Sequence, residues 1–355
     1  YQISWIMMSS PAQWEKVGKD WNKFAQTPSG TGPWKVTAFQ PQTRAELSPN
    51  KEYWDKARVP KLDKMVLLPI PEPATRTAAL RSGQVDWIEA PSPDAIPSLE
   101  KAGFKLISNA YPHNWTWHLS FADNSPWKDV RVRKAANLAV DREGLKVLLK
   151  GMMIPAKGFL TPGSQWFGSP SFDVKFDPEA AKKLLAEAGY PNGFEVTMNC
   201  PNDRYVNDSA ICQAVAANLA RVGVKINLQA ETKVSYFPKI LSRNTSFYLL
   251  GWTPSTGDSH DALSALIMTP DGKGQGQFNL GSYSNPKFDE LTTKIQSETD
   301  QKKRNEMIRE AFKIHQDDVG HLPLHQQALA WGMAKKVNLV QLPDNRMFFK
   351  WVVVK

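Results

Sequence analysis

A run of alternating residues between Tyr111 and Asp123 constrains the fold of this chain more than any other stretch. Large apolar and polar side chains alternate there with the period of two that is typical of a β-strand with one buried face. The apolar members are Trp115, Trp117, Leu119 and Phe121, and the polar members are Thr116, His118 and Ser120. The pattern predicts a half-buried strand that carries aromatic side chains along one face.

A second extended segment is predicted near the end of the chain, from His321 to Gly332. At roughly 150 residues per domain, the 355 residues of the chain suggest about two domains. We therefore interpret the two extended segments as crossings between two lobes. A cleft with aromatic strands along its floor would be a binding site.

Strand and helix signals alternate on both sides of the first crossing. After it, the order strand, helix, strand, helix, strand is clearest, and such βαβ units build parallel sheets. The predicted elements are Phe194–Met198, Asn207–Arg221, Val224–Leu228, Tyr236–Ser242 and Phe247–Trp252. The sequence therefore predicts an α/β fold with a sheet in each lobe.

The formal charge of +9 and the isoelectric point of about 9.3 raise nucleic acid as a partner. Basic residues are interspersed with acidic ones, however, as in the helix predicted from Lys302, and no arginine-rich arm or nucleic-acid motif occurs. A solvated surface explains the charge better, so no nucleic-acid partner is expected. No apolar run approaches the roughly 20 residues that span a bilayer.

The chain has two cysteines, Cys200 and Cys212. They could form a disulfide in an oxidising compartment, or they could remain two free thiols. The sequence leaves both alternatives open.

Motifs for metal binding and catalysis are absent from the sequence. His321 and His325 have the four-residue spacing of a metal-binding pair on a helix, but Pro323 between them favours an extended segment. Neither His-Glu-x-x-His nor Gly-x-Ser-x-Gly occurs. We therefore expect no metal ion and no cofactor, while carboxylates that folding brings together remain open as catalytic groups.

The loop after the strand that ends at Cys200 carries a candidate anion site. Arg204 and the N-terminus of the following helix would both favour an anionic group such as a carboxylate. Alternatively, Arg204 is a surface residue that pairs with Asp203 or Asp208. Ligands of open α/β sheets bind at this end of the strands.

The loop from Gly251 to His260 follows another strand of the same run. Trp252 would stack on a ligand, and Asp258 and His260 would make polar or charged contacts. Alternatively, Asp258 or Ser259 caps the helix that is expected to start near Asp261. The two roles can coexist.

Four patches, in this order, resemble the peptide, opine and nickel solute-binding proteins of bacterial ABC importers. They are Gly30-Thr31-Gly32-Pro33-Trp34 with Tyr53-Trp54, Thr75-Arg76-x-x-Ala79-Leu80-x-Ser82-Gly83-x-Val85-Asp86, Val130-Arg131-x-x-x-Ala135-x-Asn137-x-Ala139-x-Asp141-Arg142, and Tyr283-Ser284-Asn285-Pro286-x-Phe288-Asp289. The resemblance implies a two-lobed, periplasmic-binding-protein-like α/β fold with mixed sheets and hinge strands between the lobes. It also implies a periplasmic or otherwise extracytoplasmic, membrane-associated protein without enzymatic activity.

A protein of this kind would capture a small polar ligand in the cleft between its lobes. The resemblance implies a peptide, an opine or a related amino-acid derivative that carries a carboxylate, and delivery to an ABC permease in the inner membrane. Two alternatives remain. One is a hydrolase or transferase using the same cleft, which would need a nucleophile and a base that the sequence does not show. The other is a binding lobe repurposed as a receptor or chaperone subunit.

In the family, the Gly-Thr-Gly-Pro patch falls well inside the chain, whereas here it begins at residue 30. The resemblance therefore implies that an N-terminal portion is missing, and that this segment would be a further partner. The expected domains are an incomplete first lobe over residues 1–118, a second lobe over 119–325, and a return to the first lobe over 326–355.

Peptide-binding members read Gly-Trp-x-x-Asp in the second loop, and that Asp receives the amino group of the peptide. Ser255 stands at this position here. A neutral hydroxyl is a poor substitute, because charge-assisted hydrogen bonds are about twice as strong as neutral ones. Either Asp258 takes over this role, or the ligand is not a simple peptide with a free amino group.

The expected ligand contacts divide by chemistry. Arg204 would bind a carboxylate, and Trp252 and Trp117 would stack on the ligand. Polar contacts are expected from Ser255, Asp258, His260 and His118.

Overall fold

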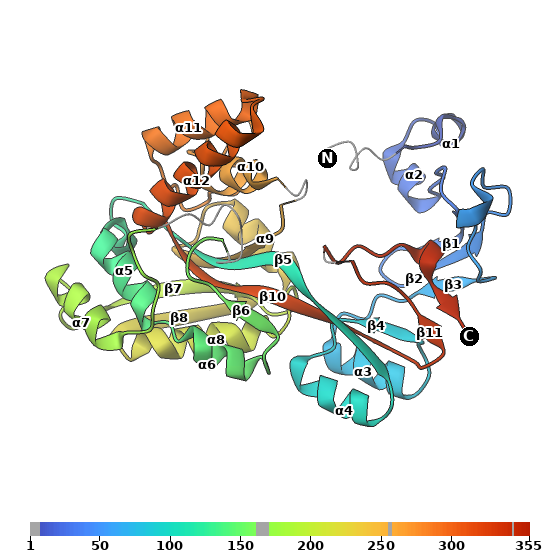
Figure 1. Ribbon diagram of the computed structural model, residues 1–355, viewed down its shortest axis with the longest axis horizontal. Coiled ribbons are helices and arrows are strands. Elements are labelled where there is room, and N and C mark those ends of the chain that lie inside the picture. The colour runs from blue at the N-terminus through green and yellow to red at the C-terminus, as the bar shows by residue number, and fades with distance from the viewer. Residues whose placement is uncertain (1–7, 161–169, 255–257, 343) are drawn as a thin grey trace. The chain divides into compact units, whose positions relative to one another are not determined.

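The computed structural model describes residues 8–160, 170–254, 258–342 and 344–355 (Figure 1). The chain forms two compact units, of which the first comprises Tyr1–Asn109 with Leu329–Lys355 and the second comprises Ala110–Ala328. Strands β5 (Lys105–Leu119) and β10 (His321–Met333) run from one unit into the other. The domain boundaries expected after residues 118 and 325 lie inside these same two strands.

The first unit consists of short helices and small sheets. Its elements are α1 (Pro11–Lys16), α2 (Trp21–Gln26), β1 (Trp34–Gln40), β2 (Arg44–Pro49), η2 (Lys56–Arg58), β3 (Met65–Leu67), α3 (Pro73–Arg81), β4 (Trp87–Glu89), η3 (Pro93–Ala95), α4 (Ile96–Lys101), β11 (Val337–Asn338), η6 (Phe349–Trp351) and β12 (Val353–Val354). Strands β1, β2 and β3 form an antiparallel sheet, and β4 pairs with the end of β10.

The second unit contains the longer elements. They are η4 (Pro126–Lys128), α5 (Val130–Ala139), α6 (Arg142–Leu148), β6 (Met153–Pro155), α7 (Pro178–Glu187), β7 (Phe194–Pro201), α8 (Asp208–Ala220), β8 (Val224–Glu231), α9 (Lys233–Leu241), β9 (Phe247–Trp252), α10 (Ser259–Ala262), the π-helix η5 (Leu263–Ile267), α11 (Pro286–Ser297) and α12 (Gln301–Asp317). The predicted run of alternating strands and helices is present as β7–α8–β8–α9–β9.

The main sheet of the second unit is mixed. Its strands follow the order β10-β5-β9-β7-β8, with β6 paired to β10 at one side. β7 is parallel to both β8 and β9, as expected for βαβ units. β5 is antiparallel to β9, with a register that runs from Asn114 opposite Trp252 to Leu119 opposite Phe247. The mixed α/β architecture was predicted from the sequence and is confirmed.

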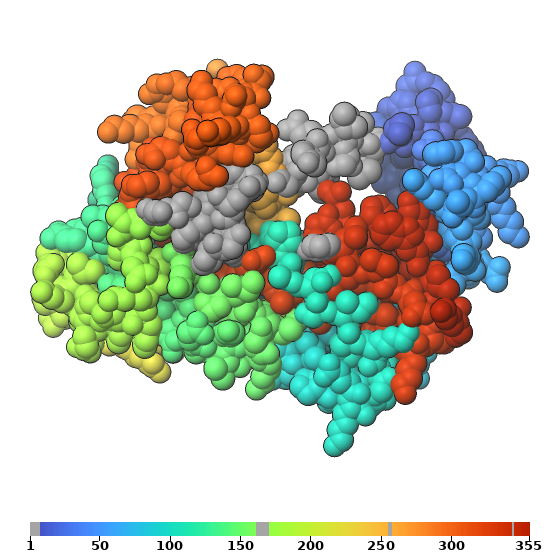
Figure 2. Space-filling view, in the orientation of Figure 1, coloured from blue at the N-terminus to red at the C-terminus, as the bar shows by residue number. Residues whose placement is uncertain are grey.

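Helices cover both faces of this sheet. Along β9, Phe247 and Leu249 pack with helices α5 to α8, whereas Tyr248 and Leu250 pack with α9 to α12. A strand that is buried on both faces reads as a continuous apolar run, as β9 does. Figure 2 shows the outer surface of α11 and α12 in orange.

Strand β5 departs from the prediction of a half-buried strand. Trp115, Trp117 and Leu119 enter the core under α5 to α8, as their alternation predicts. Thr116 and His118 point to the other face, yet only 2% and 1% of their surfaces are exposed. The prediction was wrong for that face, because the α9–α12 layer covers it and buried polar groups can find partners there.

A chain of three histidines crosses the interior of the second unit. Nδ1 of His118 lies 2.9 Å from Nε2 of His321, and Nδ1 of His321 lies 2.6 Å from Nε2 of His315. Burial is the main cause that lowers the pKa of each imidazole, and the pKa of His315 falls to about 3. Three neutral rings therefore connect β5, β10 and α12 by hydrogen bonds.

Arginines of the second unit also bind backbone carbonyls in the interior. Arg142 donates to the carbonyl oxygen of Pro323 at 2.6 and 2.8 Å and to that of Asn137 at 3.0 Å. Burial lowers the pKa of Arg142 to about 9. Arg133 donates to four further carbonyl oxygens. These guanidinium groups join helices α5 and α6 to the chain around the start of β10.

We expect the free energy of unfolding to fall steeply as the pH drops below about 6.5, the pKa of an unfolded histidine. Burial lowers the pKa of all six histidines, and five of them are almost fully buried, namely His113, His118, His315, His321 and His325. Unfolding then takes up protons, so the stability present above that pH is lost below it. A histidine with a folded-state pKa of about 3 lowers the free energy of unfolding at pH 5 by about 2 kcal/mol relative to its value above pH 6.5. Urea unfolding between pH 7.5 and 5 measures this loss.

His325→Phe provides the control for this prediction. Neither ring nitrogen of His325 has a hydrogen-bond partner among the described residues, so a phenyl ring leaves no group unpaired there. The variant should reduce the proton uptake on unfolding by about one, with stability near neutral pH retained. An unchanged pH dependence would contradict the assignment of His325 as a buried neutral group.

Arg142→Met should lower the free energy of unfolding by about 3 kcal/mol, because it leaves the carbonyl oxygens of Pro323 and Asn137 unpaired in the interior. Arg131→Met is the matched control, since Arg131 lies on the neighbouring helix and is exposed at the surface. Guanidinium unfolding compares the two variants. Equal midpoints for both would show that the carbonyl contacts of Arg142 contribute little.

Candidate functional site

The carboxyl ends of β7 and β9 meet at one edge of the main sheet, because the two strands are parallel neighbours. The loop over residues 202–207 follows β7, and residues 253–258 follow β9. β5 runs antiparallel to β9, so the segment Tyr111–Trp115 reaches the same edge. Ligands of open α/β sheets bind outside the carboxyl ends of strands. The candidate site is therefore built entirely within the second unit.

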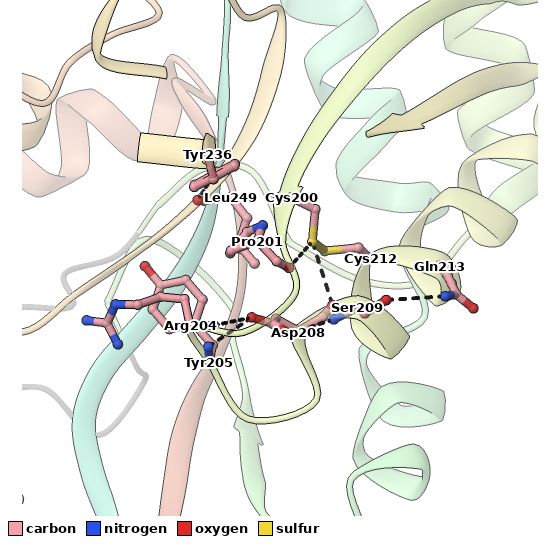
Figure 3. The surroundings of a disulfide bond; sticks show 10 residues. All are labelled: Cys200, Pro201, Arg204, Tyr205, Asp208, Ser209, Cys212, Gln213, Tyr236 and Leu249. Atoms are coloured by element: carbon pink, nitrogen blue, oxygen red, sulfur yellow. Dashed lines mark hydrogen bonds between the residues drawn. A yellow bond between two sulfur atoms is a disulfide. The ribbon is translucent and has the colours of Figure 1, made fainter. Parts of the chain in front are cut away.

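Asp208 organises the loop after β7. Its carboxylate accepts hydrogen bonds from the backbone N–H groups of Arg204, Tyr205 and Ser209, each at 2.9 Å (Figure 3). Asn207 adopts a left-handed conformation with φ of 55°, which asparagine tolerates better than most residues. This local sequence turns the chain sharply into α8.

A disulfide joins Cys200 at the end of β7 to Cys212 in α8. Both residues are fully buried. Of the two alternatives that the sequence left open, a disulfide and two free thiols, the structure shows the disulfide. This bond closes the whole loop between β7 and α8.

Arg204 is exposed, and its guanidinium carbon lies 4.7 Å from the centre of the Tyr205 ring. Figure 3 shows this guanidinium on the side of the loop away from the disulfide. Within the ranges that the structure describes, it forms no ion pair with Asp203 or Asp208. Asp203 instead accepts a hydrogen bond from the backbone of Lys233 at 2.6 Å. The alternative of a surface arginine neutralised by a neighbour is not what the structure shows.

Aromatic rings from β5, β10 and the loop pack beside Arg204. Their ring centres are 4.7 to 5.6 Å apart between neighbours. We call this group the aromatic cluster, and its members are Tyr111, His113, Trp115, Tyr205 and His325.

Hydrogen bonds hold the aromatic cluster to β9. The hydroxyl of Tyr205 accepts from the backbone N–H of Gly251 at 3.1 Å, and Nδ1 of His113 lies 2.7 Å from Oγ1 of Thr253. A Cβ at Gly251 would overlap Nε2 of His113, so glycine is required for this close approach. Nε1 of Trp115 donates to the side chain of Gln327 at 2.7 Å.

The aromatic cluster is electrically neutral at physiological pH. Burial, and to a lesser degree the positive charge of Arg204, lowers the pKa of His113 to about 3. Burial also lowers the pKa of His325 to about 3 and raises the pKa of Tyr205. Arg204 therefore offers its positive charge to a ligand beside these neutral rings.

Trp252 lies at the end of β9 and is half-buried. Its ring packs against Phe278 with a centre-to-centre distance of 5.1 Å. Its Nε1 atom is buried and has no acceptor among the described residues. The structure thus brings Trp252 to the same sheet edge as Arg204.

Asp258 caps a helix, as one of the two interpretations of this residue predicts. Its carboxylate accepts from the backbone N–H of His260 at 2.9 Å, at the start of α10. It also forms an ion pair with Arg304 at 2.9 Å. His260 is partly buried, which lowers its pKa. An ammonium group at Asp258 would have to compete with Arg304, and Ser255 lies outside the described residues.

Trp117 and His118 lie in the interior, away from the site surface. Trp117 is fully buried and packs on Phe247 at 4.9 Å between ring centres. His118 stacks on Tyr248 and belongs to the histidine chain. Neither side chain presents a surface to a ligand, so neither is expected to contact one.

Several members of the site were missed from the sequence, among them His113, Tyr205 and Thr253. A signal was present for Tyr205, which directly follows Arg204. His113 has the same parity as Trp115 in the alternation of β5, which places both side chains on one face. Thr253 carries no signal by itself, because its role depends on contact with β5.

Two negative findings concern the described residues alone. They contain no cluster of three or more histidine, cysteine or acidic side chains placed to bind a metal ion. They also contain no helix that is both long and apolar enough to cross a bilayer.

Comparison with known proteins gives consistent likenesses. The chain is 29% identical over 352 residues to the glutathione-binding protein GsiB of Pectobacterium atrosepticum. The aligned region covers 97% of this chain and 67% of that protein. Its fold matches a periplasmic binding protein of Helicobacter pylori, DppA, in complex with the peptide STSA. That match has a TM-score of 0.83 at 24% identity and covers 98% of this chain and 68% of the other.

A third likeness is to MoaA of A. tumefacien R10 in complex with mannopinic acid, with a TM-score of 0.82 at 22% identity. It covers 98% of this chain and 70% of MoaA. The chain thus spans about two thirds of the length of these three proteins.

Residues 2–274 match the family described as bacterial extracellular solute-binding proteins, family 5 Middle. The match covers well over half of the chain. The four sequence patches and the two-unit α/β fold agree with it. The chain belongs to the bacterial extracellular solute-binding proteins of family 5.

Proposed function

We propose that this protein is a non-enzymatic, extracytoplasmic solute-binding protein that captures a small solute through its carboxylate and delivers it to an ABC permease. The observation that carries the proposal is Arg204. Its guanidinium is exposed, stacked on Tyr205 and free of any ion pair in the described ranges. An unpaired arginine on an aromatic platform matches the planar geometry of a carboxylate.

The surroundings of Arg204 favour an anion. The neighbouring imidazole of His113 stays neutral because burial keeps its pKa low. The negative charge of Asp208 is turned inward to three backbone N–H groups. A bound carboxylate would therefore meet a positive charge that no described residue already pairs, so the hydrogen bond would be charge-assisted.

The chemistry of ligands bound by similar proteins supports this class of solute. Glutathione, the peptide STSA and mannopinic acid each carry at least one carboxylate. They differ in the rest of their structure. A carboxylate is the group for which this chain offers the clearest partner.

Recognition of an amino group has less support at this site. Asp258, the candidate acceptor near Trp252, already pairs with Arg304. We infer that the carboxylate contributes more to affinity than any ammonium group does. Peptides, opines and related amino-acid derivatives all remain within the proposed class.

A hydrolase or transferase receives no comparable support. His113 and Thr253 form a close pair of nitrogen and hydroxyl oxygen. The described residues place no carboxylate on the second nitrogen of His113 to orient the ring as a base. We therefore propose a structural role for this pair.

Arg204→Ala should weaken binding of a carboxylate ligand by about 1.5–3 kcal/mol, the value of a hydrogen bond to a charged group. Isothermal titration calorimetry with S-methylglutathione and with the peptide Ser-Thr-Ser-Ala measures the loss. The C-terminal amide of Ser-Thr-Ser-Ala, which has no carboxylate left, should bind both proteins with similar affinity, because the group that contacts Arg204 has been removed.

Arg221→Ala is the matched control, since Arg221 is an exposed arginine at the other end of α8. It should leave the affinity unchanged. Equal affinity of the wild type and of Arg204→Ala for the free acids would remove Arg204 from the site, and with it the main support for the proposal.

A further inference from the structure

We propose that Asp208 and the Cys200–Cys212 disulfide are positioning residues, which hold the Arg204 loop in the form that binds a carboxylate. The inference rests on the proposed function of Arg204. It assigns to these three side chains a role in affinity that is separate from the contact with the ligand itself.

Asp208 is the interior anchor of the loop. Only 3% of its surface is exposed, and both carboxylate oxygens are used, one by the N–H groups of Arg204 and Tyr205 and the other by that of Ser209. A buried carboxylate is stable when several donors satisfy it. The contact is to the backbone of Arg204, so the loop is held without using its guanidinium.

The disulfide provides the second anchor. It closes a loop that contains every residue from the end of β7 to the first turns of α8. A closed loop has fewer conformations available when other contacts open. Arg204 lies near the middle of this closed segment and depends on both anchors for its position.

Two further contacts connect the loop to its neighbours. The hydroxyl of Tyr205 accepts from Gly251 in β9, and the carboxylate of Asp203 accepts from Lys233 at the start of α9. The loop is therefore held from inside and from both sides, while the side chain of Arg204 remains exposed. Such an arrangement lowers the entropy that a ligand loses when it orders a long side chain.

Asp208→Asn tests the inference. An amide has one acceptor oxygen and directs N–H groups toward at least one of the three donors, so the loop should loosen. Hydrogen exchange measured by mass spectrometry should show faster exchange over residues 201–210. The affinity for S-methylglutathione, measured by calorimetry, should fall about fivefold to tenfold.

Asp177→Asn is the matched control. Asp177 is a half-buried aspartate that accepts from a backbone N–H at the start of α7, far from the loop in sequence. It should leave both the exchange over residues 201–210 and the affinity unchanged. The variant C200A/C212A should reproduce the effects of Asp208→Asn on exchange and affinity.

A double-mutant cycle separates positioning from general destabilisation. In the Arg204→Ala background, Asp208→Asn should cause no further loss of affinity, because there is no guanidinium left to position. The same loss in both backgrounds would overturn the inference. Faster exchange with unchanged affinity in the single variant would overturn it as well.

The same measurements distinguish this inference from the proposed function. If the wild-type chain binds neither S-methylglutathione nor Ser-Thr-Ser-Ala, the proposed function fails, and the positioning role fails with it. If the wild type binds and Arg204→Ala weakens binding while the cycle shows no coupling, the positioning role alone fails.

Discussion

The pairing of β5 with β9 is the interaction on which the second unit depends. Its register sets Trp115 opposite Gly251 and Leu119 opposite Phe247. One consequence is that both faces of the central sheet are interior, since helices pack on each side of β9. Another is that His113 lies over Gly251, where a larger residue would collide with it. A shift of one residue would turn every side chain of β5 to the opposite face.

The residues that identify the family in the sequence hold the scaffold together. Arg76 and Arg142 bind backbone carbonyls, and the side chain of Asn137 donates to two more. Asn285 caps α11 and donates to Asp318 at 2.6 Å. These side chains satisfy buried or terminal backbone groups, which every member of a fold must do. The proposed ligand contact, Arg204, lies on a loop, and loops generally vary more among homologues than the elements they connect.

Several polar side chains are buried around the strands of the second unit. Imidazoles of β5, β10 and α12 form a continuous hydrogen-bonded chain, and His325 packs against Trp115. Burial keeps these rings neutral, so they add no positive charge beside the candidate site. The guanidinium of Arg204 therefore lies next to a neutral aromatic cluster, while the carboxylate of Asp208 is bound by backbone N–H groups.

The sequence by itself determined what depends on near neighbours. Alternation in β5, the order of strands and helices from β7 to β9, and the helix cap at Asp258 each follow from residues a few positions apart. The sequence also placed Arg204 and Trp252 after parallel strands, which meet at one edge. Only the tertiary structure decided which side chains are exposed, because burial depends on helices far away in the chain. It buried Trp117 and His118, paired Asp258 with Arg304, joined the two cysteines and left Arg204 without an ion pair to any described residue.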